Sequence, residues 1–465
     1  MMFKRLMNHF GAQDMTVGKP MKNLLLFSVP LLIGNFAQQV YSATDAVVIG
    51  QFDPSGARGL AAIGVSMPIS FLMLVFMMAI STGASVMVSQ YFGAKDRETL
   101  SKTIGMSILL ILIASLVITV AGLFLTRPLL TLIGTPEDIY EMAASYLTII
   151  FIGTVGSGFY NIISGILRGL GDALTPLVFL IICVALNIAL DLIFVINFGW
   201  GVAGVAWATI IAQAISGILC VIRLCTMPDV VSIKVKYLRP FKDLLLRLLR
   251  IGVPSGLTQA VFSIAMLFTQ NLTNSMGSLV VATSTAVMRV DGFAMLPNFT
   301  FGMAISTFVG QNVGARRMDR VDEGTKDGLK LTFLISVALT ILLLLFSRHL
   351  IALFTPEQLI RDLGVRAIRI LAVGYIAMGI SQVYYGVMRG AGDTMTPMWT
   401  SIITTCVFRI PIAYLWAYLS RSETWPNGSP DALFGSLLIA WTLGCALSYI
   451  FYRIGPWRKR AETIR

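Results

Sequence analysis

Long apolar stretches recur along the whole chain and are separated by short polar connections. About 20 apolar residues in a helix cross the roughly 30 Å hydrocarbon core of a bilayer. The pattern predicts an all-α integral membrane protein. We expect twelve transmembrane helices, over residues 23–50, 61–90, 100–126, 141–167, 174–197, 202–222, 247–275, 279–311, 331–347, 367–388, 396–420 and 432–455.

Composition supports this prediction. The 465 residues are 56% hydrophobic and 12% charged, whereas a soluble domain carries about 25% charged residues. The first apolar stretch, from Leu24, follows a short polar leader without a small-residue cleavage site, so we interpret it as a membrane helix and not as a signal peptide. The five cysteines are scattered without a CxxC pair, and neither a disulfide nor a metal site is predicted from them.

The net charge is +12, and its placement along the chain indicates the topology in the membrane. Lysine and arginine concentrate in alternate connections, in the set that also holds both chain ends. This positive-inside bias predicts that both termini lie in the cytoplasm. We therefore expect no nucleic-acid partner, although the charge alone would allow one.

The chain repeats itself. The segment Ser164–Pro176 (SGILRGLGDALTP) returns as Tyr385–Pro397 (YGVMRGAGDTMTP), 221 positions on from Ser164 to Tyr385. The repeat predicts two six-helix bundles in tandem, an N-terminal lobe over residues 1–235 and a C-terminal lobe over residues 236–465. Six is an even number of spans, so the lobes run parallel and are related by a pseudo-twofold axis along the membrane normal.

Acidic residues inside the predicted spans need a reason, because a charge at membrane depth costs several kcal/mol. Asp45 lies late in the first span, and Asn187 and Asp191 lie four residues apart on one face of the fifth. Thr209 in the sixth span adds a hydroxyl oxygen. These four residues predict a site for a coupling ion, H⁺ or Na⁺. Two alternatives stay open: Asp191 caps a helix or pairs with an arginine, and Asp45 lies near the solvated outer interface.

The second half does not repeat this cluster. Phe408, followed by Arg409, stands at the position that corresponds to Asn187. Arg289 and Asp291 lie on the second span of this half, and Arg409 lies on its fifth. These residues form either a structural arginine–aspartate pairing or, through Asp291, an attraction for a cationic substrate. Our candidates for the lining of a substrate cavity are Gln38, Tyr41, Arg289 and Asp291.

Pro30 is the candidate hinge of the first span, because proline removes one backbone hydrogen bond and bends a helix. Packing alone is an equally good account of any single proline.

The residues of common enzyme and ATPase motifs are missing. The dipeptide Gly18-Lys19 is followed by Pro20, so it belongs to no phosphate-binding loop. His9 and His349 fall outside the spans and suggest no metal cluster. We therefore predict a protein that is not an enzyme, has no cofactor, and takes its energy from an ion gradient. Any metal ion would be Na⁺ at Asp45, Asn187 and Asp191.

Taken together, the motifs resemble the multidrug and toxic compound extrusion (MATE) family, in its bacterial DinF-like or Gram-positive-type branch. The resemblance covers nearly the whole chain. It is carried by residues 30–39 (PLLIGNFAQQ), 44–50, 90–96 (QYFGAKD), 165–172 (GILRGLGD), 187–191 and 199–209, with their echoes in the second half.

This resemblance implies a V-shaped twelve-helix fold in the bacterial cytoplasmic membrane. It implies export of drugs or toxic organic cations in exchange for H⁺ or Na⁺. In the DinF-like branch the ion site matches Asp45, Asn187 and Asp191 here, with Thr209 beside them, and the bending proline matches Pro30. The acid of the NorM-like branch is absent from residues 258–263. We expect a monomer.

A second function stays open. Flippases for lipid-linked oligosaccharides or peptidoglycan precursors are built on a similar fold and line their cavity with several cationic residues. Only Arg289, Arg369 and Arg409 are candidates here, and the pair Asp45 and Asp191 favours a cation. The sequence therefore favours the exporter.

Overall fold

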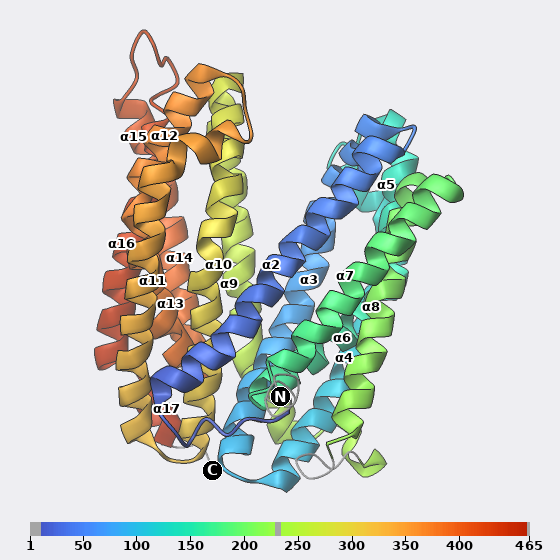
Figure 1. The fold of residues 1–465 in the computed structure, drawn as a ribbon, viewed down its shortest axis with the longest axis vertical. Coiled ribbons are helices and arrows are strands. Elements are labelled where there is room, and N and C mark those ends of the chain that lie inside the picture. Colours follow the sequence, from blue (N-terminus) through green and yellow to red (C-terminus); the bar gives the residue numbers. More distant parts are fainter. Residues whose placement is uncertain (1–10, 228–233, 463–465) are drawn as a thin grey trace, which may run out of the picture. The chain divides into compact units, whose positions relative to one another are not determined.

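The computed structural model describes residues 11–227 and 234–462, and every regular element in these ranges is a helix (Figure 1). Ten helices are long and apolar enough to cross a membrane, and two bent helix pairs bring the number to twelve if each pair is one span. Backbone polar groups find no partner in hydrocarbon, so a chain this apolar satisfies them within helices. The predicted all-helical class with twelve spans is confirmed.

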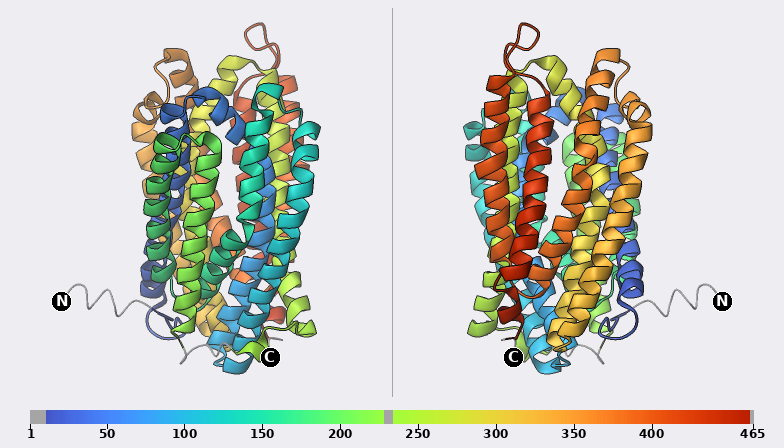
Figure 2. Two further views of the ribbon diagram at one scale, coloured as in Figure 1. Left: turned by 90° about the vertical axis from the view of Figure 1, so that its right-hand side faces the viewer. Right: turned by 90° about the vertical axis from the view of Figure 1, so that its left-hand side faces the viewer.

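The helices divide into two compact units, each a bundle of helices that run side by side (Figures 1 and 2). The first unit comprises residues 1–14 and 29–256, and the second comprises residues 15–28 and 257–465. The division after Gly256 lies later than the boundary at 235/236 that we predicted, and part of the predicted linker, residues 228–233, lies outside the described residues.

The first unit holds most of α2 and the beginning of α9. Its elements are α2 (Pro20–Phe52), α3 (Gly56–Gly93), α4 (Arg97–Leu132), α5 (Glu137–Ile152), α6 (Thr154–Gly169), α7 (Leu174–Leu192), the π-helix η1 (Ile193–Asn197), α8 (Gly201–Cys225) and the short 3₁₀ turn η2 (Val235–Tyr237).

The second unit repeats this order. Its elements are α9 (Lys242–Ser275), α10 (Ser278–Gly314), α11 (Met318–Ala352), α12 (Gln358–Ala372), α13 (Gly374–Gly390), α14 (Met395–Ile402), the π-helix η3 (Ile403–Arg409), α15 (Ile410–Leu419), α16 (Asp431–Ile454) and α17 (Trp457–Glu462).

Two predicted spans are broken helices, and the breaks are equivalent. The pair α5 and α6 bends by 51° at Gly153, and the pair α12 and α13 bends by 43° at Val373. A glycine at each break lets the next helix approach. A Cβ on Gly153 would lie 2.1 Å from Ile210 of α8, and one on Gly374 would lie 2.6 Å from Trp441 of α16. The bend is thus fixed by packing against the sixth span of the same half.

The repeated Gly-Asp-x-x-Thr-Pro segment ends one helix and starts the next. Gly171 and Gly392 adopt φ of +85° and +83°, a conformation that favours glycine. Asp172 then accepts hydrogen bonds from the backbone N–H of Thr175, at 3.0 Å, and from its hydroxyl, at 2.6 Å. Asp393 makes the same two bonds to Thr396. The motif is therefore a structural turn with a helix cap, and the similarity of the two halves extends to these contacts.

The first helix of each half begins in the other half's unit. Residues 15–28, with the start of α2, belong to the second unit, where the backbone N–H of Met15 donates to Gln311 at 2.8 Å. The start of α9 belongs to the first unit, where Arg247 donates to Gln90 at 2.6 Å. Gln90 and Gln311 are themselves 221 positions apart.

Two prolines stand where α2 and α9 pass from one unit to the other. Pro30 lies two residues after Ser28, and Pro254 lies two residues before Gly256. Each helix continues through its proline without a break. The hydrogen bond that a proline lacks is therefore missing at the passage between units.

Glycines let the start of α9 approach α3. A Cβ on Gly83 would lie 2.7 Å from the backbone oxygen of Leu248, and one on Gly252 would lie 2.5 Å from that of Ala79. Small residues at such contacts are what allow close helix packing in membranes, where van der Waals contact replaces the hydrophobic effect.

We predict that Gly83→Ala destabilises the protein by about 1–3 kcal/mol, because the new methyl group forces α9 away from α3. Gly64→Ala on the same helix is the matched control, since nothing lies within 4 Å of its Cβ position. Thermal unfolding in detergent measures both variants. Equal melting temperatures would show that α9 and α3 are not held together through Gly83.

Candidate functional site

Polar side chains from three helices of the first unit meet in an apolar bundle. Asp45 comes from α2, Asn187 and Asp191 from α7, and Thr209 from α8. Asn187 and Asp191 are fully buried and Thr209 nearly so, whereas Asp45 is half-buried. The structure thus brings Asp45, Asn187 and Asp191 together, and Thr209 lies beside Tyr41, on which Asp45 acts electrostatically.

Asn187 links the two acids. With its amide nitrogen turned towards them, it donates to Asp45 Oδ1 at 3.0 Å and to Asp191 Oδ2 at 3.3 Å. The carboxyl groups of Asp45 and Asp191 also act on each other electrostatically, and Asn187 contacts both. Two carboxyl groups make such a contact favourably only when they share a proton or a cation.

Three buried oxygens at the cluster have no hydrogen-bond partner in the described part of the chain: Asp191 Oδ1, the Thr209 hydroxyl and the Tyr41 hydroxyl. Tyr41 faces Thr209, and both Asp45 and Cys183 act on it electrostatically. Buried polar atoms are rarely left without a partner, so a set that converges marks a place for an ion or water. Hard oxygen donors are the ligands that Na⁺ and H⁺ can use.

Neither alternative for Asp191 matches the structure. Asp191 lies within the last turn of α7 and accepts no capping bond, and the described residues contain no ion pair within 4.0 Å for it. Asp45 lies well inside α2, which ends at Phe52, and is in contact with buried partners. Tyr146 of α5 was missed by sequence reasoning. It lies near both acids, and a tyrosine in an otherwise apolar span was its only signal.

The fifth span leaves α-helical geometry directly after the acid. The π-helix η1 begins two residues beyond Asp191. In the second half η3 occupies residues 403–409 and ends just before Pro411, whose missing N–H removes one α-helical bond. Single π-helical turns are frequent at functional sites because they re-aim side chains.

The other cavity candidates lie apart from the cluster. Gln38 is exposed on α2, and Arg289 is exposed on α10. Asp291, two residues on, is half-buried and accepts a hydrogen bond of 2.7 Å from the Tyr375 hydroxyl. Tyr375 was also missed, because nothing in the sequence joins α13 to α10.

The predicted arginine–aspartate pairing is wrong as an ion pair. Among the described residues no basic side chain lies within 4.0 Å of Asp291, although Arg409 acts on it electrostatically. The Nε atom of Arg409 is buried without a hydrogen-bond partner. The partner that replaces the arginine is the Tyr375 hydroxyl, which reaches Asp291 from the neighbouring helix.

Comparisons with known proteins agree with the repeat. A model of the MatE family matches residues 30–193 and 254–415, one match in each half. The probable multidrug resistance protein YoeA of Bacillus subtilis (strain 168) is 29% identical over 452 residues, which are 95% of each chain. The probable multidrug resistance protein YpnP of the same organism is 31% identical over 451 residues, 96% of this chain and 98% of the relative.

A solved structure described as MATE in the bent conformation superposes on this chain with a TM-score of 0.88 at 25% sequence identity, covering 97% of this chain and 98% of the other. The family match spans well over half of the chain and both of its repeats. This chain therefore belongs to the MatE family, as its motifs predicted.

Proposed function

We propose that this protein is a secondary active multidrug efflux transporter. It exports cationic or amphipathic compounds across the bacterial cytoplasmic membrane in exchange for H⁺ or Na⁺, as a monomer with both termini in the cytoplasm. The observation that carries the proposal is the buried cluster of Asp45, Asn187 and Asp191. The names of the relatives YoeA and YpnP support the substrate class.

The cluster can take either coupling ion. With its amide nitrogen towards the acids, Asn187 stabilises a proton shared by Asp45 and Asp191. With its amide turned, the oxygen of Asn187 faces the two carboxylates, and these oxygens are hard donors for Na⁺. Asp45 is half-buried while its partners are fully buried, so the ion exchanges from the α2 side.

Alternating access requires that ion binding changes the conformation of a helix. Asp45 and Pro30 lie on the same helix, and Pro30 stands where α2 passes from the second unit to the first. Loading the acids removes the repulsion that holds α2 and α7 apart at the cluster. We propose that α2 responds by bending at Pro30, where one backbone hydrogen bond is already missing.

The flippase alternative has less support. Arg289 is exposed and Arg409 is half-buried. Asp291 lies two residues after Arg289 in the sequence, and the charge of Arg409 acts on Asp291. A pyrophosphate headgroup calls for several converging cations without a neighbouring carboxylate. The second unit is instead suited, through Asp291 and Tyr375, to the cationic part of an amphipathic drug.

Transport in proteoliposomes tests the proposal. We expect a pH gradient alone or a Na⁺ gradient alone to drive the export of ethidium. We expect no export when both gradients are collapsed. Movement of a fluorescent lipid-linked sugar, with no gradient-driven ethidium movement, would favour the flippase.

Asp45→Asn and Asp191→Asn should each reduce gradient-driven efflux to the background of empty liposomes, because an amide neither exchanges a proton nor neutralises a cation. Asp291→Asn is the comparison: it should keep coupling and alter which substrates are preferred. Initial rates with two substrates of different charge measure all three. An inactive Asp291→Asn beside an active Asp191→Asn would move the coupling site to the second unit.

Thr209→Val tests whether the coupling ion is H⁺ or Na⁺. The valine has the shape of threonine without its oxygen, so a Na⁺ site would lose one ligand and need about tenfold more Na⁺ for half-maximal rate. A site that takes only protons should keep its pH dependence nearly unchanged. Sodium titration of efflux at fixed pH distinguishes the outcomes. Thr119→Val on α4 is the control, because its hydroxyl donates to the Phe151 oxygen at 2.8 Å.

Pro30→Ala restores the missing hydrogen bond and should favour a straight α2. We expect turnover several-fold slower, with little change in substrate affinity and an unchanged or higher melting temperature. Rate, affinity and unfolding are measured on one preparation. Loss of stability at an unchanged rate would mean that Pro30 serves packing, and would leave the role of Asp45 untouched.

A further inference from the structure

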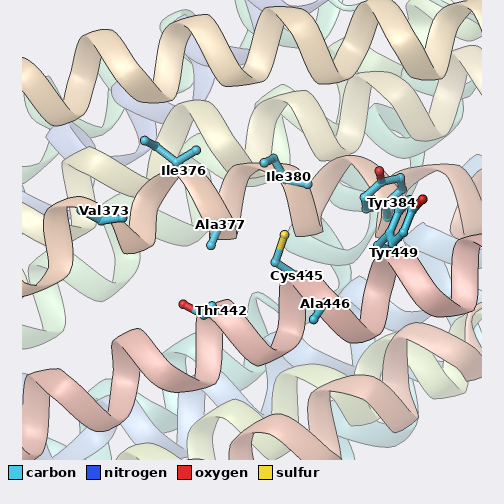
Figure 3. A pocket seen from close by; sticks show the side chains of 9 residues that line it. All are labelled: Val373, Ile376, Ala377, Ile380, Tyr384, Thr442, Cys445, Ala446 and Tyr449. Carbon is cyan, nitrogen blue, oxygen red and sulfur yellow. The ribbon is translucent and has the colours of Figure 1, made fainter.

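The second unit carries a groove that the proposed transport mechanism does not use. It lies between α13 and α16, has a volume of about 560 Å³, and is lined by nine residues of these two helices and the break before α13 (Figure 3). Val373 and Tyr449 at its ends are 64% and 49% exposed, so the groove opens at the surface of the unit. Between them the walls are small or aliphatic, as at Ala377, Ile380 and Ala446.

One end of the groove is polar. The rings of Tyr384 and Tyr449 stand side by side there, 5.9 Å apart (Figure 3). Neither hydroxyl has a hydrogen-bond partner in the part of the chain that the structure describes. The third hydroxyl group in the lining, that of Thr442, already has a partner, because it donates a hydrogen bond to the backbone oxygen of Leu438 at 2.9 Å.

A cation stands next to this end. Arg453 lies four residues after Tyr449 on α16, one helical turn on, and its charge acts on the Tyr384 hydroxyl. It is exposed, and it has no ion pair within 4.0 Å among residues 11–227 and 234–462. Two of the three basic residues on α17 are paired: Arg458 with Asp322 at 2.6 Å, and Arg460 with Asp393 at 2.7 Å.

We propose that this groove is a binding site for a phospholipid with an anionic headgroup. One acyl chain lies against the apolar walls, and the phosphate lies at Arg453 with the Tyr384 and Tyr449 hydroxyls donating to it. The charge at the end of α16 selects the headgroup. This end lies on the side that we propose to be cytoplasmic, and the cytoplasmic leaflet holds the anionic lipids that such a cation attracts. Tyrosine residues are typical of the membrane interface.

The dimensions favour a lipid over a protein. A transmembrane helix is about 10 Å across and about 30 Å long, far more than the groove can seat. A helix of a second copy would also bring apolar surface to an unpaired arginine and two unpaired hydroxyls, which costs free energy. A phosphate oxygen satisfies all three groups at once.

Lipid binding in detergent tests the site. The wild-type protein in dodecyl maltoside is titrated with phosphatidylglycerol and, separately, with phosphatidylcholine, and bound lipid is measured by native mass spectrometry alongside the melting temperature. We expect tighter binding of phosphatidylglycerol. Arg453→Ala should weaken it about fivefold, the effect of one basic residue near an anionic lipid surface, and leave phosphatidylcholine unchanged.

A second variant tests the apolar part. Ala446→Phe fills the open groove and should reduce the binding of both lipids. The matched controls are Arg97→Ala, an exposed arginine of the first unit without an ion pair, and Ile450→Phe, an exposed residue one turn further along α16 that does not line the groove.

Two outcomes would overturn the proposal. One is lipid binding by Arg453→Ala and Ala446→Phe that equals binding by their controls. The other is a dimer in light scattering that Ala446→Phe dissociates without any loss of bound lipid, which would assign the groove to a second copy of the chain.

Discussion

Hydrocarbon offers no hydrogen bonds, and the rest of this structure follows from that constraint. Backbone groups are satisfied within helices, so the described chain is helical almost throughout. Side chains that carry charge or a hydroxyl at membrane depth must find a partner inside the bundle or leave a site for one. The cluster in the first unit does both. With its amide nitrogen towards them, Asn187 bonds the two acids, and Asp191 Oδ1 and the hydroxyls of Tyr41 and Thr209 have no hydrogen-bond partner among the described residues.

The polar side chains inside the spans find their partners in different ways in the two halves. In the first half the polar groups come from the first, fifth and sixth spans, and in the second half from the second, fourth and fifth. Among the described residues, two acids meet at an amide in the first half alone. In the second half Asp291 is held by the Tyr375 hydroxyl, and Arg409 remains without an ion pair in the described residues. Duplication therefore kept the scaffold and not the site. Such a scaffold permits one half to bind the coupling ion while the other half contacts the substrate.

The scaffold itself is conserved between the halves at the level of single contacts. The broken spans bend at Gly153 and Val373, each against the sixth span of its own half, and the turns at Asp172 and Asp393 close with the same two bonds. The first helix of each half starts in the other unit, next to Gln311 or Gln90. The chain crosses from one unit to the other within α2 and within α9, and a proline lies near each crossing.

The sequence alone determined the class of the protein. Apolar length, charge placement and repetition are local or periodic properties, and the first two directly govern how a chain inserts into a bilayer. It also selected Asp45, Asn187, Asp191 and Thr209, since an uncompensated polar group in a span is conspicuous. What it did not determine were the partners supplied by other helices. Tyr146 and Tyr375 look like ordinary span residues. The hydrogen-bond partner of Asp291 was not predicted, because the sequence does not show that α13, which carries Tyr375, packs alongside α10. The breaks at Gly153 and Val373 were also missed, because only the close approach of α8 and α16 decides that a continuous apolar run must bend there.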